Sequence, residues 1–135
     1  MKILPHLLVP LIQLCIAPFS LSAHHSFAAD YDASKPITLH GTVTKFEWMN
    51  PHACVYLNVK GDAGETTQWE FELGSPNTLM RSGWNRNSLK VGDEVIVKGS
   101  RSKDYPNHGN ATSILSRDGK ILLSGVSAGE SLVAR

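Results

Sequence analysis

The chain has 135 residues, a length that suits one domain, and carries 13 basic and 12 acidic side chains for a formal net charge of +1. This balance provides no basic stripe, so we expect no nucleic-acid partner, because binding to phosphate backbones depends on clustered lysine and arginine.

The first 23 residues are typical of a signal peptide. Lys2 precedes an apolar stretch from Ile3 to Leu21, and Ser22 and Ala23 are small residues of the kind found before a cleavage point. A membrane anchor is the alternative, but three prolines and a glutamine interrupt the ~20 apolar residues that a spanning helix needs. We predict a signal peptide over residues 1–23, with cleavage after Ser22 as a variant, and a periplasmic or secreted protein with no stable membrane anchor.

Cleavage before His24 would leave 112 residues (135 minus 23) with 12 basic and 12 acidic side chains, because Lys2 is the only charged residue removed. Cys15 would be removed as well, so Cys54 would be the single thiol and no internal disulfide would form. The fold must then be stabilised by an ordinary apolar core.

The mature chain begins with residues 24–36, which show no sustained period and are predicted to form an extended N-terminal arm. Alternating apolar residues then predict a first strand over 37–48. Within it the apolar phase shifts from Val43 to Phe46 and Trp48, which predicts a β-bulge.

The remaining elements follow from turn and capping signals. Ser75 as N-cap, Pro76 at the first helical position and Gly83 as a left-handed stop predict a short helix. Around it we predict strands over 53–60, 66–73, 94–101, 110–116 and 121–123, with a polar loop over 102–109. Residues 124–135 are predicted to be a flexible C-terminal tail.

Three strands, a short helix and two strands, in this order, predict a mainly all-β chain, and more narrowly a five-stranded OB-like barrel over residues 37–123. Closure of the sheet would remove its exposed edges. A small open β-sandwich is the alternative. The predicted core comprises Val43, Val55, Leu57, Trp69, Phe71, Val95 and Val97.

Several segments together have a recognisable pattern: HHSFAADYD (24–32), EWMNPHA (47–53), GSPN (74–77) and the LKVGDEV of residues 89–95. In these segments the chain resembles a family of small exported bacterial proteins known only as a domain of unknown function. The resemblance implies no activity. Members often carry an aromatic residue where this chain has Cys54, which argues against a required thiol.

A mature N-terminal His24 would offer a metal two nitrogens, its α-amine and its ring Nδ1. A second imidazole would complete a three-nitrogen site of the kind that suits Cu(II), and both groups can be deprotonated near neutral pH. We therefore consider copper as a cofactor, with His25 as a helper. The alternative is a polar terminus with two chance histidines.

Two further histidines are predicted to lie in loops, His52 between the first two strands and His108 between the fourth and fifth. OB barrels use these two loops on one ligand-binding face. The arm, at up to ~3.3 Å per residue, is long enough to bring His24 to them. The candidate metal ligands are therefore His24, His25, His52 and His108. The alternatives are a turn residue for His52 and a solvated loop residue for His108.

The outward side of the second and third strands carries polar side chains and is a candidate ligand face. Its predicted residues are Trp48, Asn50, Tyr56, Glu70, Glu72 and Tyr105. The alternative is an ordinary solvated sheet surface.

The sequence offers little for catalysis, because it has no nucleophile elbow and no phosphate-cradling glycine loop, and Cys54 lies in a strand rather than at a helix N-terminus. We predict a binding module rather than an enzyme, with copper as the candidate metal. A metal-free OB-type module that binds a small ligand, a glycan or a protein partner is the alternative, and an accessory subunit of an enzyme complex is a third reading.

Overall fold

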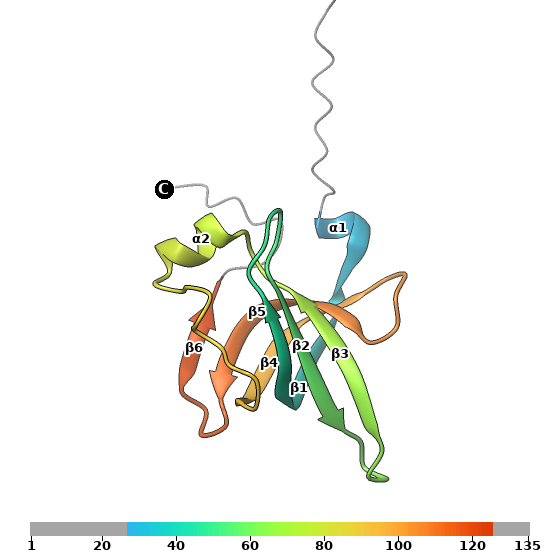
Figure 1. Cartoon of the computed structure of the whole chain (residues 1–135). Coiled ribbons are helices and arrows are strands. Elements are labelled where there is room, and N and C mark those ends of the chain that lie inside the picture. Colours follow the sequence, from blue (N-terminus) through green and yellow to red (C-terminus); the bar gives the residue numbers. More distant parts are fainter. Residues whose placement is uncertain (1–26, 126–135) are drawn as a thin grey trace, which may run out of the picture.

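The computed structural model describes residues 27–125 (Figure 1). The predicted signal peptide, His24, His25 and residues 126–135 of the predicted tail lie outside the described residues. The described chain is mainly β. Its elements are α1 (Phe27–Asp30), β1 (Tyr31–Glu47), β2 (Cys54–Lys60), β3 (Thr66–Glu72), α2 (Pro76–Arg81), β4 (Glu94–Ser102), β5 (His108–Ser116) and β6 (Ile121–Ser124).

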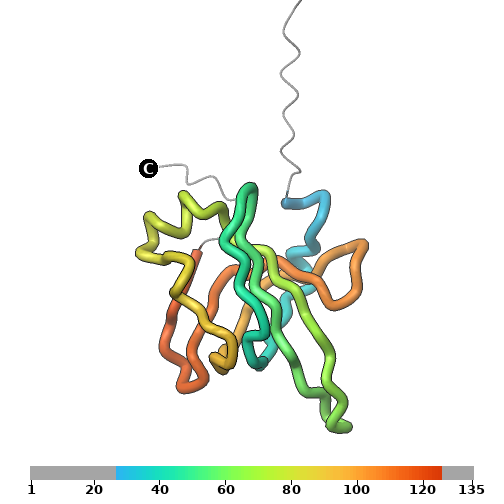
Figure 2. The backbone as a smooth tube through the Cα atoms, viewed as in Figure 1, coloured from blue at the N-terminus to red at the C-terminus, as the bar shows by residue number. Residues whose placement is uncertain are grey.

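The six strands form one sheet in the order β3-β2-β1-β4-β5-β6, and β3 also pairs with β5. The β3–β5 pairing is parallel and the others are antiparallel. The pairings therefore run from β1 through β2, β3, β5 and β4 and back to β1. The backbone trace shows the strongly curved sheet that results (Figure 2).

The long first strand serves two partners, because its first part pairs with β4 and its last part with β2. Its register against β2 shifts between Val43 and Lys45, which makes Thr44 the extra residue of a bulge. Val43 is buried, and Phe46 and Trp48 pack against the same core beyond the bulge. The predicted bulge and change of phase are confirmed.

The core lies within the ring of paired strands. It is formed by the alternate side chains of each strand that point inward. All seven predicted core residues are buried, with at most 6% of each exposed: Val43, Val55, Leu57, Trp69, Phe71, Val95 and Val97. Leu79 from α2 and Trp84 close the core at one end, and the Trp84 ring nitrogen donates to the Leu122 carbonyl at 2.8 Å.

The short helix α2 forms where the capping signals predicted it. The Ser75 hydroxyl accepts a hydrogen bond from the Thr78 amide at 3.3 Å, and Pro76 begins the helix. Gly83 adopts a φ of +83°, a left-handed conformation that glycine tolerates without strain.

The start of β1 differs from the sequence prediction, since the strand begins at Tyr31 rather than at residue 37. Tyr31 and Asp32 pair with Ser102 and Arg101 of β4, and the register then shifts before Pro36. The polar residues between Asp32 and Pro36 interrupt the apolar alternation, so the sequence pattern does not reveal this first piece of strand. It brings the N-terminal segment, including α1, onto the sheet.

Candidate functional site

The outward face of β2 and β3 brings four titratable side chains together. Cys54 and Tyr56 of β2 stand opposite Glu72 and Glu70 of β3, respectively. Phe71, between the two glutamates, is fully buried in the core, so strand alternation directs both glutamates outward. The result is a polar surface supported by a rigid, packed sheet.

Glu72 joins three separate parts of the chain. The Tyr31 hydroxyl donates to Glu72 Oε2, and His52 Nδ1 contacts Glu72 Oε1. His52 comes from the loop between β1 and β2, and its side chain is 34% exposed. A hydrogen bond from Nδ1 to the carboxylate leaves Nε2 as the nitrogen that can bind a ligand. The contact therefore orients His52 with its second nitrogen free of this carboxylate.

A second carboxylate, Glu47 at the end of β1, borders the same face. The Tyr56 hydroxyl donates to Glu47 Oε2 at 2.9 Å and lies 3.3 Å from Glu70 Oε1. Lys45 forms an ion pair with Glu47 and lies 5.2 Å from the centroid of the Tyr56 ring. Hydrogen bonds from Lys45 and Tyr56 lower the pKa of Glu47, while burial and the bond to Glu47 raise the pKa of Tyr56. Glu47 therefore stays ionised and Tyr56 stays protonated near neutral pH.

Cys54 lies among these carboxylates and is partly exposed. Burial raises the pKa of its thiol to about 12, and the negative charges of Glu70, Glu72 and Glu47 add to the shift. A nucleophilic cysteine needs a thiolate, which positive neighbours or a helix N-terminus would favour. The charged groups around Cys54 are negative instead, so its thiol stays protonated and is not an activated nucleophile.

A cavity of about 520 Å³ lies beside this face, under the loop between β4 and β5. Its sheet side is formed by Tyr56, Gln68, Trp69 and Glu70, and its loop side by residues 105–108. Sites for small ligands typically occupy roughly 300–1,000 Å³. The cavity is therefore large enough to hold a small molecule.

His108 is the first residue of β5, so its predicted position in a loop is wrong. Its strand pairs in parallel with β3, where His108 stands opposite Glu70, and this pairing extends β5 two residues beyond the predicted start at 110. The His108 ring lies 5.9 Å from the Tyr31 ring and 6.1 Å from the Tyr105 ring, between centroids. Its Nδ1 is buried and has no hydrogen-bond partner within residues 27–125.

The predicted face residues lie in four places. Tyr56, Glu70 and Tyr105 line the cavity. Glu72 lies next to it and holds Tyr31 and His52. Trp48 is not part of the cavity lining, because its ring packs against the core, 6.0 Å from the Phe46 ring. Asn50 is exposed in the loop before His52.

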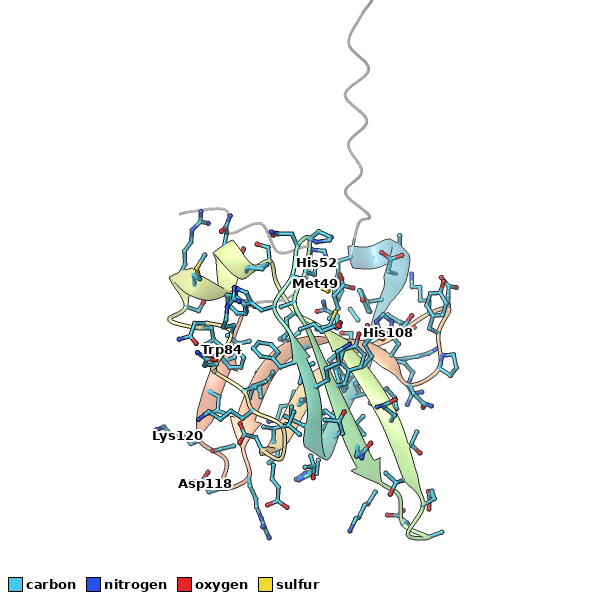
Figure 3. The ribbon with its side chains drawn as sticks, viewed as in Figure 1. Met49, His52, Trp84, His108, Asp118 and Lys120 are labelled. Carbon is cyan, nitrogen blue, oxygen red and sulfur yellow. The ribbon has the colours of Figure 1, made fainter. Side chains whose placement is uncertain are left out.

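The structure brings His52 and His108 to the same strand, β3, where one contacts Glu72 and the other stands opposite Glu70. Figure 3 shows His52 at the end of the molecule that carries α1, and His108 nearer the β4–β5 loop.

Within the described part of the chain, no three His, Cys, Asp or Glu side chains are grouped to hold a metal ion. Nor does any helix there have the length and apolarity to cross a membrane. The remaining predicted ligands, His24 and His25, lie outside the described residues.

Tyr31 is the main site residue that sequence reasoning missed. The sequence pattern predicted that Tyr31 lies in the extended N-terminal arm and assigned it no role. In the structure its side chain is buried and its hydroxyl donates a hydrogen bond to Glu72. Phe27 and Tyr31 are four residues apart, the spacing of neighbours on a helical turn, and their rings lie 5.4 Å apart. This spacing was an available signal for the helical turn of α1.

Comparison with known proteins gives one match, to a protein family. No curated protein and no solved structure matches the chain. The family described as "Family of unknown function (DUF6152)" matches residues 13–113, a range that contains all the described site residues named above. The match covers most of the chain and agrees with the resemblance in its sequence segments. The chain belongs to this family of unknown function.

Proposed function

We propose that this protein is an exported binding module built on an OB-like five-stranded barrel. The ring of pairings β1-β2-β3-β5-β4, with α2 between β3 and β4, supports the barrel. OB barrels bind ligands on the face of strands two and three, between the loops that follow strands one and four. The carboxylates, His52 and the cavity all lie on that face. The signal-like sequence of residues 1–23 supports export to the periplasm or the medium.

In its sharper form, the proposal is that the processed protein binds one Cu(II) through the His24 amine and ring, with His52 as the third nitrogen ligand. The observation that carries it is the bridge through Glu72, which ties Tyr31 and His52 to a single carboxylate. His24 precedes Phe27, the first residue of α1, by three residues, a span of up to roughly 10 Å when extended. The bridge brings Tyr31 and His52 to one carboxylate, which supports the proposal that His24 reaches His52.

The chemistry of His52 fits this role. Glu72 holds Nδ1, so Nε2 is the nitrogen available to a metal, and carboxylates in this position commonly orient metal-binding imidazoles. An amine with two imidazoles is a nitrogen-rich set of the kind that Cu(II) favours. His25 and His108 are further candidate ligands, because one adjoins His24 and the other lies close to Tyr31.

Copper titration of two forms of the protein tests this proposal. One form begins at His24 and the other carries one extra glycine before it, which removes the free amine of His24 and keeps every side chain. We expect tight binding by the first form alone, weaker binding after His52→Ala, and no change after His40→Ala, since His40 is an exposed residue of β1. Equal affinities of the two forms would exclude coordination by the amine.

A metal-free interaction module is the second candidate, and the cavity of about 520 Å³ favours it. Such a module would bind a small ligand, a glycan or an extended part of a protein partner on the same face. Failure of both forms to bind Cu(II) would leave this function as the better account.

A further inference from the structure

The charge of the cavity points to the class of ligand it binds. Glu70 is the one carboxylate in its lining, which contains no lysine or arginine. The neighbouring carboxylates are each paired, Glu47 with Lys45 and Glu72 with His52. Glu70 forms no ion pair within residues 27–125, and the Tyr56 hydroxyl donates to it in a long contact of 3.3 Å. Glu70 is thus a carboxylate of the lining that has no ion-pair partner within the described residues.

The remaining polar and aromatic groups suit a cation that carries N–H donors. His108 lines the cavity, and its Nδ1 is buried and has no hydrogen-bond partner within the described residues. Aromatic faces attract cations within about 6 Å of the ring centroid. Two rings near the cavity already attract cations of the protein, since Lys45 lies over Tyr56 at 5.2 Å and the Arg101 guanidinium lies over Trp69 at 4.9 Å.

Tyr105 provides an aromatic surface that no cation of the described chain covers. It is 68% exposed, and its ring meets the His108 ring edge-on. It therefore forms an outer wall opposite the sheet. A ligand between this wall and Glu70 would contact a carboxylate at one end and aromatic carbon along its length.

We propose that the cavity binds a small organic cation, an alkyl- or arylammonium ion, with Glu70 as its counter-ion. The ammonium group donates to Glu70, and the hydrocarbon part lies against Tyr56 and Tyr105. The raised pKa values of Cys54 and Tyr56, to which Glu70 contributes, agree with a negative potential on this face. The inference rests on the proposal that this face binds a ligand, and it does not depend on copper.

The test is a titration followed by amide NMR shifts of the processed protein, with three probes. Phenethylamine carries an aromatic ring and an ammonium group, 2-phenylethanol is its neutral counterpart, and diacetylchitobiose is a neutral glycan. We expect saturable shifts at Gln68, Glu70 and His108 with phenethylamine, at an affinity at least about tenfold above that for 2-phenylethanol. Glu70→Gln should abolish this preference. Glu94→Gln, which removes the same charge from the start of β4, should leave it unchanged.

Three outcomes would overturn the inference. Equal binding of phenethylamine and 2-phenylethanol would show that the charge plays no part. Binding of the glycan without the amine would disprove the ligand class and retain the binding face. No binding of any probe would show that the cavity is not a site, while the copper titration would still decide the metal proposal by itself.

Discussion

At the scale of single residues, Phe71 separates the two faces of β3. It is 0% exposed and stacks on Trp69 at 5.8 Å, while the glutamates on either side point outward. Its side chain therefore supports the core and also fixes the direction of Glu70 and Glu72.

We expect Phe71→Ala to lower the free energy of unfolding by about 3–5 kcal/mol, because it removes a fully buried aromatic ring and leaves a cavity. Urea unfolding of both proteins measures the loss. Tyr105→Ala is the control and should cost less than about 0.5 kcal/mol, since Tyr105 is exposed. A loss below about 1 kcal/mol for Phe71→Ala would contradict its position in the core.

We expect Cys54 to make the fold sensitive to alkaline pH. The thiol has a folded-state pKa of about 12 against an ordinary value of 9.0, so between these values the unfolded chain loses a proton that the folded protein retains. The free energy of unfolding should therefore be unaffected by this group below pH ~9 and should fall as the pH rises above it, by at most about 1.4 kcal/mol per unit. Raised pKa values of Tyr31 and Tyr56 act in the same direction.

The contribution of the thiol is measured by comparing urea unfolding of the wild type and Cys54→Ala at pH about 8 and about 10.5. We expect the wild type to lose more stability between the two conditions than the variant does. An identical loss in both proteins would assign the alkaline sensitivity to other groups.

At the scale of elements, the sequence predicted the features that depend on residues close together in the chain. The capping of α2 by Ser75 and the alternation of β2 and β3 are contained in a few neighbouring residues, and the structure confirms them. The first residues of β1 and β5 were missed, because distant partners hold them. Tyr31 is in a strand because β4 pairs with it, and His108 because β3 does.

Gly99 shows how closely β4 and β5 approach. The register of the pair shifts beside it, and a Cβ at this position would lie 1.9 Å from the Asn110 carbonyl oxygen. We expect Gly99→Ala to lower the free energy of unfolding by about 1–3 kcal/mol or more, because backbone rather than a flexible side chain must move.

The matched control is Lys98→Ala at the adjacent exposed position of β4, which should change stability by less than about 0.5 kcal/mol. Thermal unfolding followed by circular dichroism compares the two variants. Equal, small effects would show that β5 can shift to admit the methyl group.

At the scale of the whole molecule, the element order predicted a mainly β chain with one helix between the third and fourth strands. Both features are present, but the second short helix, α1, lies in the segment that was predicted to be an extended arm. Much of the candidate site could also be predicted, since the outward residues Tyr56, Glu70 and Glu72 follow from strand alternation. The bridge from Tyr31 through Glu72 to His52 could not be predicted. Tyr31 and Glu72 are 41 residues apart in the sequence, and their contact depends on the curvature of the sheet.

This bridge should contribute to global stability and to any metal affinity of His52. Tyr31→Phe keeps the buried ring and removes the hydroxyl that donates to Glu72, so we expect a loss of about 1.5–3 kcal/mol, the range for a hydrogen bond to a charged group. Urea unfolding measures it, with Tyr105→Phe as the control. An unchanged stability would show that solvent replaces the hydroxyl without cost.

The parallel contact between β3 and β5 consists of three register pairs, from Glu70–His108 to Glu72–Asn110, and is the shortest link in the ring of strands. Short links open first in local fluctuations, so amide protons there should exchange with solvent sooner than those of the β1–β4 ladder. Glu70 and His108 belong both to this link and to the cavity. A ligand that contacts both residues would therefore stabilise the β3–β5 pairing, and its binding should appear as slower hydrogen–deuterium exchange along β5.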